Sequence, residues 1–179
     1  MRINVSPTGW GPRMGLQPED LEALRAQLAQ GHIARAYSAI IGYMSRLRAS
    51  YSTGEWPVSG LYQGQFDMTY FAIFPPTLKA RDLKLAVVFD YASFRFEIWL
   101  AARNRPVQRR YWELLNEGGW TKHRLVEPAV GVDAIAVSEV ADGGSLTDPE
   151  SLTIELDAAV WSLLSDLEDF LSVHDPRAV

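Results

Sequence analysis

Residues 66–101 read FDMTYFAIFPPTLKARDLKLAVVFDYASFRFEIWLA, and this stretch decides the fold of the 179-residue chain. It contains three runs rich in aromatic and β-branched residues, which favour strands. The runs cover residues 66–74, 83–90 and 94–101. Pro75 and Pro76 end the first run, and the short link DYAS joins the other two as a hairpin. The stretch therefore predicts a three-stranded antiparallel meander.

Helical periodicity flanks the meander on both sides. Residues 18–51 repeat apolar side chains every three or four positions, with a break at Gly31, and predict the N-terminal helix. Residues 105–116 predict a helix directly after the third strand. Asp148 is an N-cap for the stretch 149–171, whose leucines recur at helical spacing and predict a C-terminal helix.

Two more apolar runs lie between the last two helices. Residues 123–127 and 133–140 predict one or two further strands, separated by Pro128 and Gly131. The order is then an N-terminal helix, the meander, a helix, one or two strands, and a C-terminal helix packed on the sheet. We therefore expect the α+β class, in which antiparallel strands and helices are segregated along the chain.

The length suits a single domain, which we place at residues 17–172. Residues 1–16 carry three glycines and two prolines and are expected to form a flexible N-terminal arm. Residues 173–179 are expected to form a C-terminal tail.

The composition excludes several classes of protein. The chain has no cysteine, so a disulfide framework, a thiolate metal site and a cysteine nucleophile are ruled out. The first residues lack the apolar core of a secretion signal, and no run is long enough to span a membrane. A net charge of −5 argues against nucleic acid as the partner. We expect a soluble, cytoplasmic protein.

The common catalytic and cofactor motifs are missing from the sequence. His32, His123 and His174 lie in no context typical of a catalytic triad. The chain has no glycine-rich phosphate loop and no metal-binding pattern such as H-E-x-x-H. The sequence therefore predicts no cofactor and no metal site.

Polar side chains alternate with the large apolar ones along the meander. If the apolar set around Val87 packs on the helices, the polar set faces away from them. The polar set consists of Asp67, Thr69, Lys84, Arg95, Glu97 and Trp99. One interpretation is a solvated sheet face with charge pairs such as Arg95 or Lys84 against Glu97. The other is a binding surface, because a wet face has no need of the Trp99 indole.

Arginines crowd the corner AARNRPVQRR at residues 101–110, where the third strand passes into a helix. These are Arg103, Arg105, Arg109 and Arg110. Cations near a helix N-terminus oppose its dipole, and together with free backbone N–H groups they favour a phosphate or carboxylate ligand. Alternatively, Arg109 pairs with Glu113 one turn later and the others are solvated. Both interpretations stay open.

The element order resembles the core of the PD-(D/E)XK nucleases, in which two acids and a lysine hold a divalent metal that activates water. The resemblance implies catalytic roles for Asp82 and Glu97, with Lys84 substituting from the neighbouring strand. Trp99 stands where that family has lysine, and Arg81 precedes Asp82 where it has proline. The chain would then be a degenerate member of this superfamily.

A second resemblance covers roughly residues 30–171. The segments D-M-T-Y-F and F-E-I-W-L-A, with the following R-N and Q-x-x-Y-W, are similar to a family of uncharacterised bacterial proteins, a domain of unknown function. The matching positions are Asp67, Met68, Thr69, Tyr70, Phe71, Glu97, Trp99, Arg103, Asn104, Gln108, Tyr111 and Trp112. Ala102 stands before R-N where the family has glycine, which leaves less room for close backbone approach. The resemblance implies a small stand-alone bacterial protein and supplies no activity.

Three functional hypotheses follow. The first is a non-catalytic module that binds a small anionic molecule or a protein partner. Its expected ligand-binding residues are Asp67, Glu97, Trp99, Arg103, Asn104, Arg105, Gln108, Arg109 and Trp112. The second is a metal-dependent phosphodiesterase that uses Asp82, Glu97 and Lys84. The third is an interaction subunit whose exposed aromatic residues form a homodimer interface.

Overall fold

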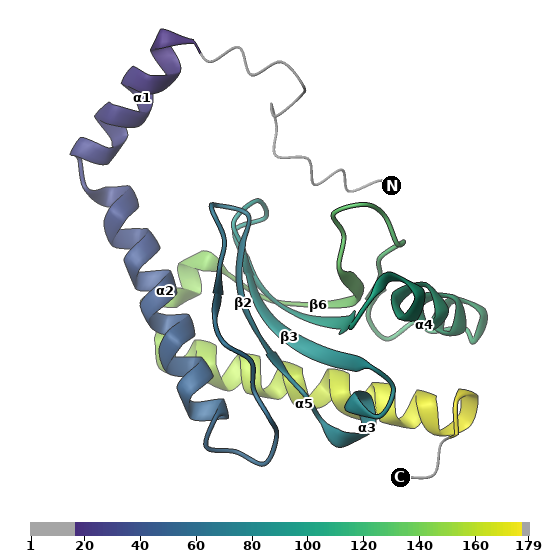
Figure 1. The fold of residues 1–179 in the computed structure, drawn as a ribbon. Coiled ribbons are helices and arrows are strands. Elements are labelled where there is room, and N and C mark those ends of the chain that lie inside the picture. Colours follow the sequence, from purple (N-terminus) through teal and green to yellow (C-terminus); the bar gives the residue numbers. More distant parts are fainter. Residues whose placement is uncertain (1–16, 177–179) are drawn as a thin grey trace.

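The structure is a computed structural model that describes residues 17–176. It confirms the α+β class and shows a six-stranded sheet packed against helices (Figure 1). The strands are β1 (Tyr62–Gln63), β2 (Met68–Ile73), β3 (Leu83–Asp90), β4 (Arg95–Ala102), β5 (Arg124–Leu125) and β6 (Ala134–Asp142). The helices are α1 (Pro18–Ala29), α2 (His32–Tyr51), α3 (Pro76–Lys79), α4 (Arg105–Glu117), the 3₁₀ turn η1 (Gly143–Thr147) and α5 (Pro149–His174).

The sheet is antiparallel throughout, with the strand order β1-β2-β3-β4-β6-β5. The predicted meander forms its centre as β2, β3 and β4. The later apolar runs form β5 and β6, and β6 pairs with β4. The strands thus build one continuous surface from two separate parts of the chain.

Helices α2 and α5 cover one face of this sheet. Figure 1 shows α5 running beneath the strands, where it contacts β3, β4 and β6, while α2 contacts β2. The apolar set predicted around Val87 points to this side and is fully buried with the leucines of α5. Burying this apolar surface is the main favourable contribution to folding.

The helix breaks follow local chemistry. Gly31 adopts a positive φ of 72° between α1 and α2, a conformation that glycine reaches without steric penalty. No residue of α1 is buried, so this helix projects from the body of the molecule. In the described part of the chain, no helix combines the length and apolar character needed to cross a membrane.

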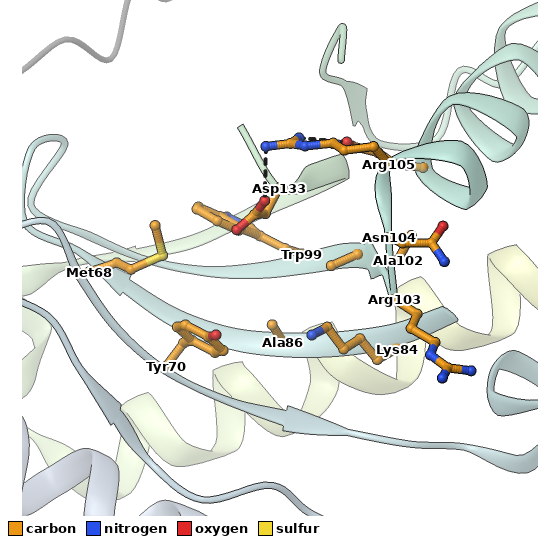
Figure 2. Close-up of a pocket in the computed structure, with 12 residues that line it drawn as sticks. Met68, Tyr70, Lys84, Ala86, Trp99, Ala102, Arg103, Asn104, Arg105 and Asp133 are labelled. Atoms are coloured by element: carbon orange, nitrogen blue, oxygen red, sulfur yellow. Dashed lines mark hydrogen bonds and ion pairs between the residues drawn. The ribbon is translucent and has the colours of Figure 1, made fainter. Parts of the chain in front are cut away.

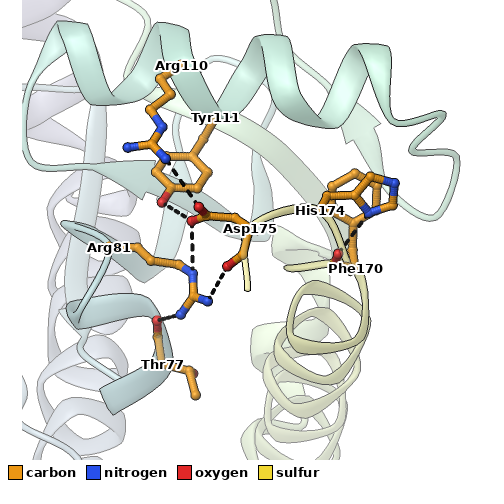
Figure 3. Close-up of polar contacts among 7 residues, drawn as sticks. All are labelled: Thr77, Arg81, Arg110, Tyr111, Phe170, His174 and Asp175. Carbon is orange, nitrogen blue, oxygen red and sulfur yellow. Dashed lines mark hydrogen bonds and ion pairs between the residues drawn. The ribbon is translucent and has the colours of Figure 1, made fainter. Parts of the chain in front are cut away.

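The C-terminal end of α5 is anchored by charges (Figure 3). The Asp175 carboxylate lies 3.3 Å from Nε of Arg81 and 3.2 Å from a guanidinium nitrogen of Arg110. The Tyr111 hydroxyl donates to the same carboxylate at 2.8 Å. The predicted tail at 173–179 therefore begins inside α5, while the predicted arm at 1–16 lies outside the described residues.

The side-chain phase predicted for the first meander strand is wrong. Thr69 pairs with Phe89 in the ladder, so it points toward the helices, and it is fully buried. Met68 and Tyr70 occupy the opposite face instead. Asp67 precedes β2, and its carboxylate accepts a hydrogen bond from the backbone N–H of Met68 at 2.7 Å. The alternation of this strand is ambiguous because both of its sides carry aromatic residues.

Candidate functional site

A cavity of about 290 Å³ opens on the sheet face that α2 and α5 leave uncovered. It lies where β4 passes into α4, and Figure 2 shows its walls. The lining comes from β2, β3, β4, the N-terminal end of α4 and the start of β6. It comprises Met68, Tyr70, Lys84, Ala86, Trp99, Ala101, Ala102, Arg103, Asn104, Arg105, Gln108 and Asp133.

Three cations and one carboxylate line this cavity. Lys84 extends along the sheet face toward Ala86 (Figure 2), and within residues 17–176 its ammonium has no hydrogen bond or ion pair. Arg103 forms an exposed pair with Asp82 at 3.5 Å, which contributes little stability. The cavity therefore carries excess positive charge in a protein whose net charge is −5.

Arg105 is fixed in place at the cavity rim. Its guanidinium donates to the Gln108 side-chain oxygen at 2.7 Å and to the carbonyl of Val132, and it lies 3.4 Å from the Asp133 carboxylate. Gln108 is buried and donates in turn to the carbonyls of Val132 and Ala134 at 2.9 and 3.2 Å. These contacts lock the start of α4 onto the start of β6.

The positive end of α4 faces the same region. Asn104 caps the helix, and its side-chain oxygen accepts from the backbone N–H of Val107 at 3.0 Å. The first turn contains no acidic residue, so no carboxylate of that turn offsets the positive end of the dipole or the arginines beside it. An anion bound in the cavity would be attracted both by the positive end of the α4 dipole and by the arginine side chains.

The floor of the cavity is aromatic and apolar. Trp99 and Tyr70 stand on it with Met68 and Ala86 (Figure 2). The Tyr70 ring packs on Tyr62 of the edge strand with centroids 5.1 Å apart. Burial raises the pKa of Tyr70, and the nearby Asp133 adds to the rise, so the phenol stays neutral and can donate a hydrogen bond.

Glu97 fixes the orientation of the Trp99 ring through a hydrogen bond. It is 5% exposed, and the Trp99 indole N–H donates to its carboxylate at 2.5 Å. Burial raises the pKa of Glu97, while the hydrogen bond from Trp99 opposes the rise. The β4–β6 register shifts at Phe96/Glu97 and again at Leu100/Ala101, and such irregularities re-aim side chains.

The predicted charge pairing on this face is not what the structure shows. Arg95 pairs with Glu139 of β6 at 3.4 Å and not with Glu97. Lys84 and Glu97 are four residues apart along the ladder, since Lys84 faces Ala101 and Glu97 faces Val88. The centre of the face is buried rather than solvated, because Glu97 and Val88 have almost no exposed surface.

Five of the expected ligand-binding residues line the cavity. These are Trp99, Arg103, Asn104, Arg105 and Gln108. Glu97 is not part of the lining, but it accepts the hydrogen bond that orients Trp99. Three others lie outside the lining: the Asp67 carboxylate accepts from the backbone N–H of Met68, Arg109 is exposed, and the half-buried Trp112 packs against the core.

Sequence reasoning missed Met68, Tyr70 and Asp133 as lining residues. The alternation of side chains along β2 would have placed Met68 and Tyr70 on this face if the two sides of the strand had been assigned correctly. Asp133 carried no such signal, because its place depends on β6 pairing with β4.

The residues implied by the nuclease resemblance are far apart. Glu97 pairs with Val88, whereas Asp82 precedes Leu83 at the other end of β3. Asp82 and Val88 are six residues apart along the strand, roughly 20 Å at the usual rise per residue, while ligands of one metal ion lie within a few ångströms of each other. Among the described residues, no group of three or more His, Asp or Glu side chains could hold a metal ion.

Comparison with known proteins identifies a family and no activity. A search of curated proteins and of solved structures found no match to this chain. A scan against protein families matches residues 17–171 to a domain of unknown function, DUF7000. That match spans both the sheet and the helices that cover it, as well as every residue of the cavity lining. The chain therefore belongs to the DUF7000 family.

Proposed function

We propose that the protein is a non-catalytic binding module whose ligand is a small anion attached to a planar or apolar group. The observation that carries this proposal is the Lys84 ammonium, which has no partner among residues 17–176, in a cavity that Arg103 and Arg105 also line. A buried or half-buried cation without a counter-charge is unfavourable, and an anionic ligand would supply that charge.

The charged part and the aromatic part of the cavity contact different groups of the ligand. Lys84, Arg103 and the N-terminal end of α4 bind the charged group of the ligand. Trp99 and Tyr70 contact its planar or apolar part. Arg105 is already held by Gln108 and the start of β6, so it shapes the rim and contributes its charge at longer range.

The lining favours binding over turnover. Within residues 17–176 the lining contains no serine, threonine or histidine, and its one carboxylate, Asp133, is exposed and paired with Arg105. Nucleophilic and general acid–base catalysis need an activated group next to a positioned base. The described lining residues offer no such pair.

Calorimetric titration with phenyl phosphate, inorganic phosphate and benzyl alcohol tests this proposal. Phenyl phosphate is expected to bind more tightly than either of the others, because it alone uses both parts of the cavity. Lys84→Met keeps the apolar stem and removes the charge, and should weaken binding by roughly tenfold to a hundredfold, since a hydrogen bond to a charged group contributes about 1.5–3 kcal/mol.

Arg109→Met is the matched control, because Arg109 lies on α4 outside the cavity. Equal affinities of the two variants would contradict the proposal, as would the absence of saturable binding by any anion. Thermal stabilisation by Mg²⁺ alone would instead favour the phosphodiesterase hypothesis.

A protein partner is a second candidate, favoured by the exposed face of α1. Leu21, Leu24 and Leu28 lie on one side of this helix and are 53%, 51% and 48% exposed. An apolar stripe of this kind is typical of helix-mediated association. Light scattering of the native chain and of a Leu24→Ser/Leu28→Ser variant tests it: a dimer that the variant dissociates would support association through α1, and a native monomer would contradict homodimerisation.

A further inference from the structure

A second cavity, of about 340 Å³, lies at the edge of the helix layer beside β2. The C-terminal turn of α2, the loop that follows it and the middle of α5 form its walls. The lining comprises Ser50, Tyr51, Gly54, Glu55, Trp56, Ile73, Asp157 and Trp161. None of these residues lines the first cavity, so the two are separate sites.

Three aromatic side chains define the shape of this cavity. The rings of Trp56 and Trp161 are 4.7 Å apart between centroids and inclined at 55°. Trp56 and Tyr51 are half-buried and pack against the core, which fixes their positions. Trp161 is 59% exposed even though it packs on Trp56, so much of its indole surface is open to a ligand.

The charges in this cavity are negative. The Tyr51 hydroxyl donates to the Asp157 carboxylate at 2.5 Å, and Glu55 lies at the exposed rim. No lysine, arginine or histidine is among the described lining residues. Asp157 therefore has a hydrogen-bond donor in the cavity but no cation.

Indole faces and carboxylates together favour one kind of ligand. The face of an indole ring carries partial negative charge and attracts cations, most effectively when water is excluded. A small hard ion such as Mg²⁺ or Ca²⁺ prefers six or more oxygen ligands, which two carboxylates beside three aromatic rings cannot supply. A large cation with methyl groups buries apolar surface against the rings and places its charge near Asp157.

We propose that this cavity binds a small organic cation of the quaternary or alkylated ammonium type. Trp56, Trp161 and Tyr51 line one wall and contact the methyl groups, and Asp157 with Glu55 supplies the counter-charge. A volume of about 340 Å³ is at the small end of ligand sites, which fits a free low-molecular-weight cation. This inference is independent of the anion-binding proposal, because the two cavities share no residue.

Nuclear magnetic resonance of the tryptophan indole N–H signals tests the proposal. Choline should shift the signals of Trp56 and Trp161 saturably and leave that of Trp99 unchanged. The neutral isostere 3,3-dimethylbutanol has the same shape without the charge and should bind at least tenfold more weakly. Equal binding of choline and the isostere, or no saturable shift with choline, would overturn the proposal.

Variants locate the site. Trp161→Ala removes an exposed side chain and should weaken choline binding about tenfold. Asp157→Asn keeps the acceptor for Tyr51, removes the charge and should weaken binding severalfold. Ile154→Ala is the matched control, because Ile154 is a 70% exposed apolar residue two turns earlier on α5. Unchanged choline affinity in both Trp161→Ala and Asp157→Asn would overturn the assignment.

A final comparison distinguishes a free cation from a lipid headgroup. Phosphatidylcholine vesicles present the same trimethylammonium group at a membrane surface. The proposal predicts that choline at equal concentration shifts the indole signals and that the protein does not sediment with the vesicles. Sedimentation without any effect of choline would overturn the free-cation proposal in favour of membrane binding.

Discussion

The two cavities of this molecule have similar volumes and opposite charges. Among the described residues, the cavity on the open sheet face is lined by three cations and one carboxylate, whereas the cavity beside β2 is lined by two carboxylates and no cation. The first gathers around the positive end of α4, and the second lies between the loop after α2 and the middle of α5. The sign of the first site agrees with the helix end that borders it, whereas the sign of the second comes from the side chains of Glu55 and Asp157.

The carboxylates also act differently at the two sites. Glu97 lies behind Trp99, where its charge is buried and it accepts the indole N–H. Asp157 lies in the wall of the second cavity, where the same kind of group remains available to a ligand. A buried carboxylate orients an aromatic wall, while a half-exposed one sets the charge of the site. We expect each cavity to reject the ligand of the other.

The largest expected effect comes from a change that should leave both cavities intact. Asp175→Ala removes the counter-charge of Arg81, whose side chain is 6% exposed. A buried cation without its partner is strongly unfavourable, so we expect unfolding free energy to fall by about 3 kcal/mol and Tm by roughly 6–12 °C. Thermal denaturation followed by circular dichroism measures this change.

Val173→Ala is the control for this prediction, because Val173 is 72% exposed two residues before Asp175 and should change stability by less than about 0.5 kcal/mol. Below the transition, phenyl phosphate and choline affinities of the Asp175→Ala protein should equal those of the native chain. A loss of phenyl phosphate affinity alone would show that the anchor also positions α4, and the two sites would then differ in their dependence on α5.

Reversing one charge sharpens the contrast between the sites. Lys84→Glu should lower the affinity for phenyl phosphate by about a hundredfold, because an attractive contact becomes a repulsive one. Choline affinity should stay unchanged. Arg109→Glu makes the same change in net charge outside the cavity, and calorimetry of both variants separates local contact from long-range attraction. Similar losses in the two variants would mean that the first cavity attracts anions only through its general field.

The smallest effect concerns the pH dependence of stability. Burial raises the pKa of Glu97, so the folded state holds this proton more tightly than the unfolded chain. The stability that protonation contributes is present below the unfolded pKa and is lost as the pH rises through the folded pKa. Glu97→Gln should therefore raise Tm by roughly one to three degrees at pH 7, and the gain should shrink toward pH 4.

Glu139→Gln is the contrasting control, because Glu139 is half-exposed and pairs with Arg95 and Arg124. Removing the Glu139 charge should therefore not raise Tm at pH 7. If the Tm difference between Glu97→Gln and the native chain were the same at both pH values, ionisation of Glu97 would not contribute to stability.

The sequence predicted most of the fold because its periodic signals are long. The leucines of α5, the break at Gly31 and the meander all appear in the structure as expected. The short elements β1 and α3 were missed, since two to four residues give no measurable period. The phase of β2 was misassigned because Tyr70 and Phe71 are both large and apolar, and only the pairing with β3 decides which one faces the core.

The candidate site was predicted in part, for a similar reason. The corner at 103–108 is one continuous segment, so its arginines and Gln108 could be grouped from the sequence. Asp133 and Tyr70 belong to other strands and reach the cavity through strand pairing. The second cavity joins the end of α2 with the middle of α5, which are about a hundred residues apart in the chain, and no local pattern connects them.

By itself, the sequence determined the class of fold, the helices, the central strands and the presence of a basic corner. Each of these depends on spacing or charge within a short window, where backbone geometry fixes which side chains share a face. The tertiary structure alone decided which carboxylates are buried, which ion pairs form and how the two cavities differ in charge. Those properties depend on distances between residues far apart in the chain, and only strand register and helix packing set such distances.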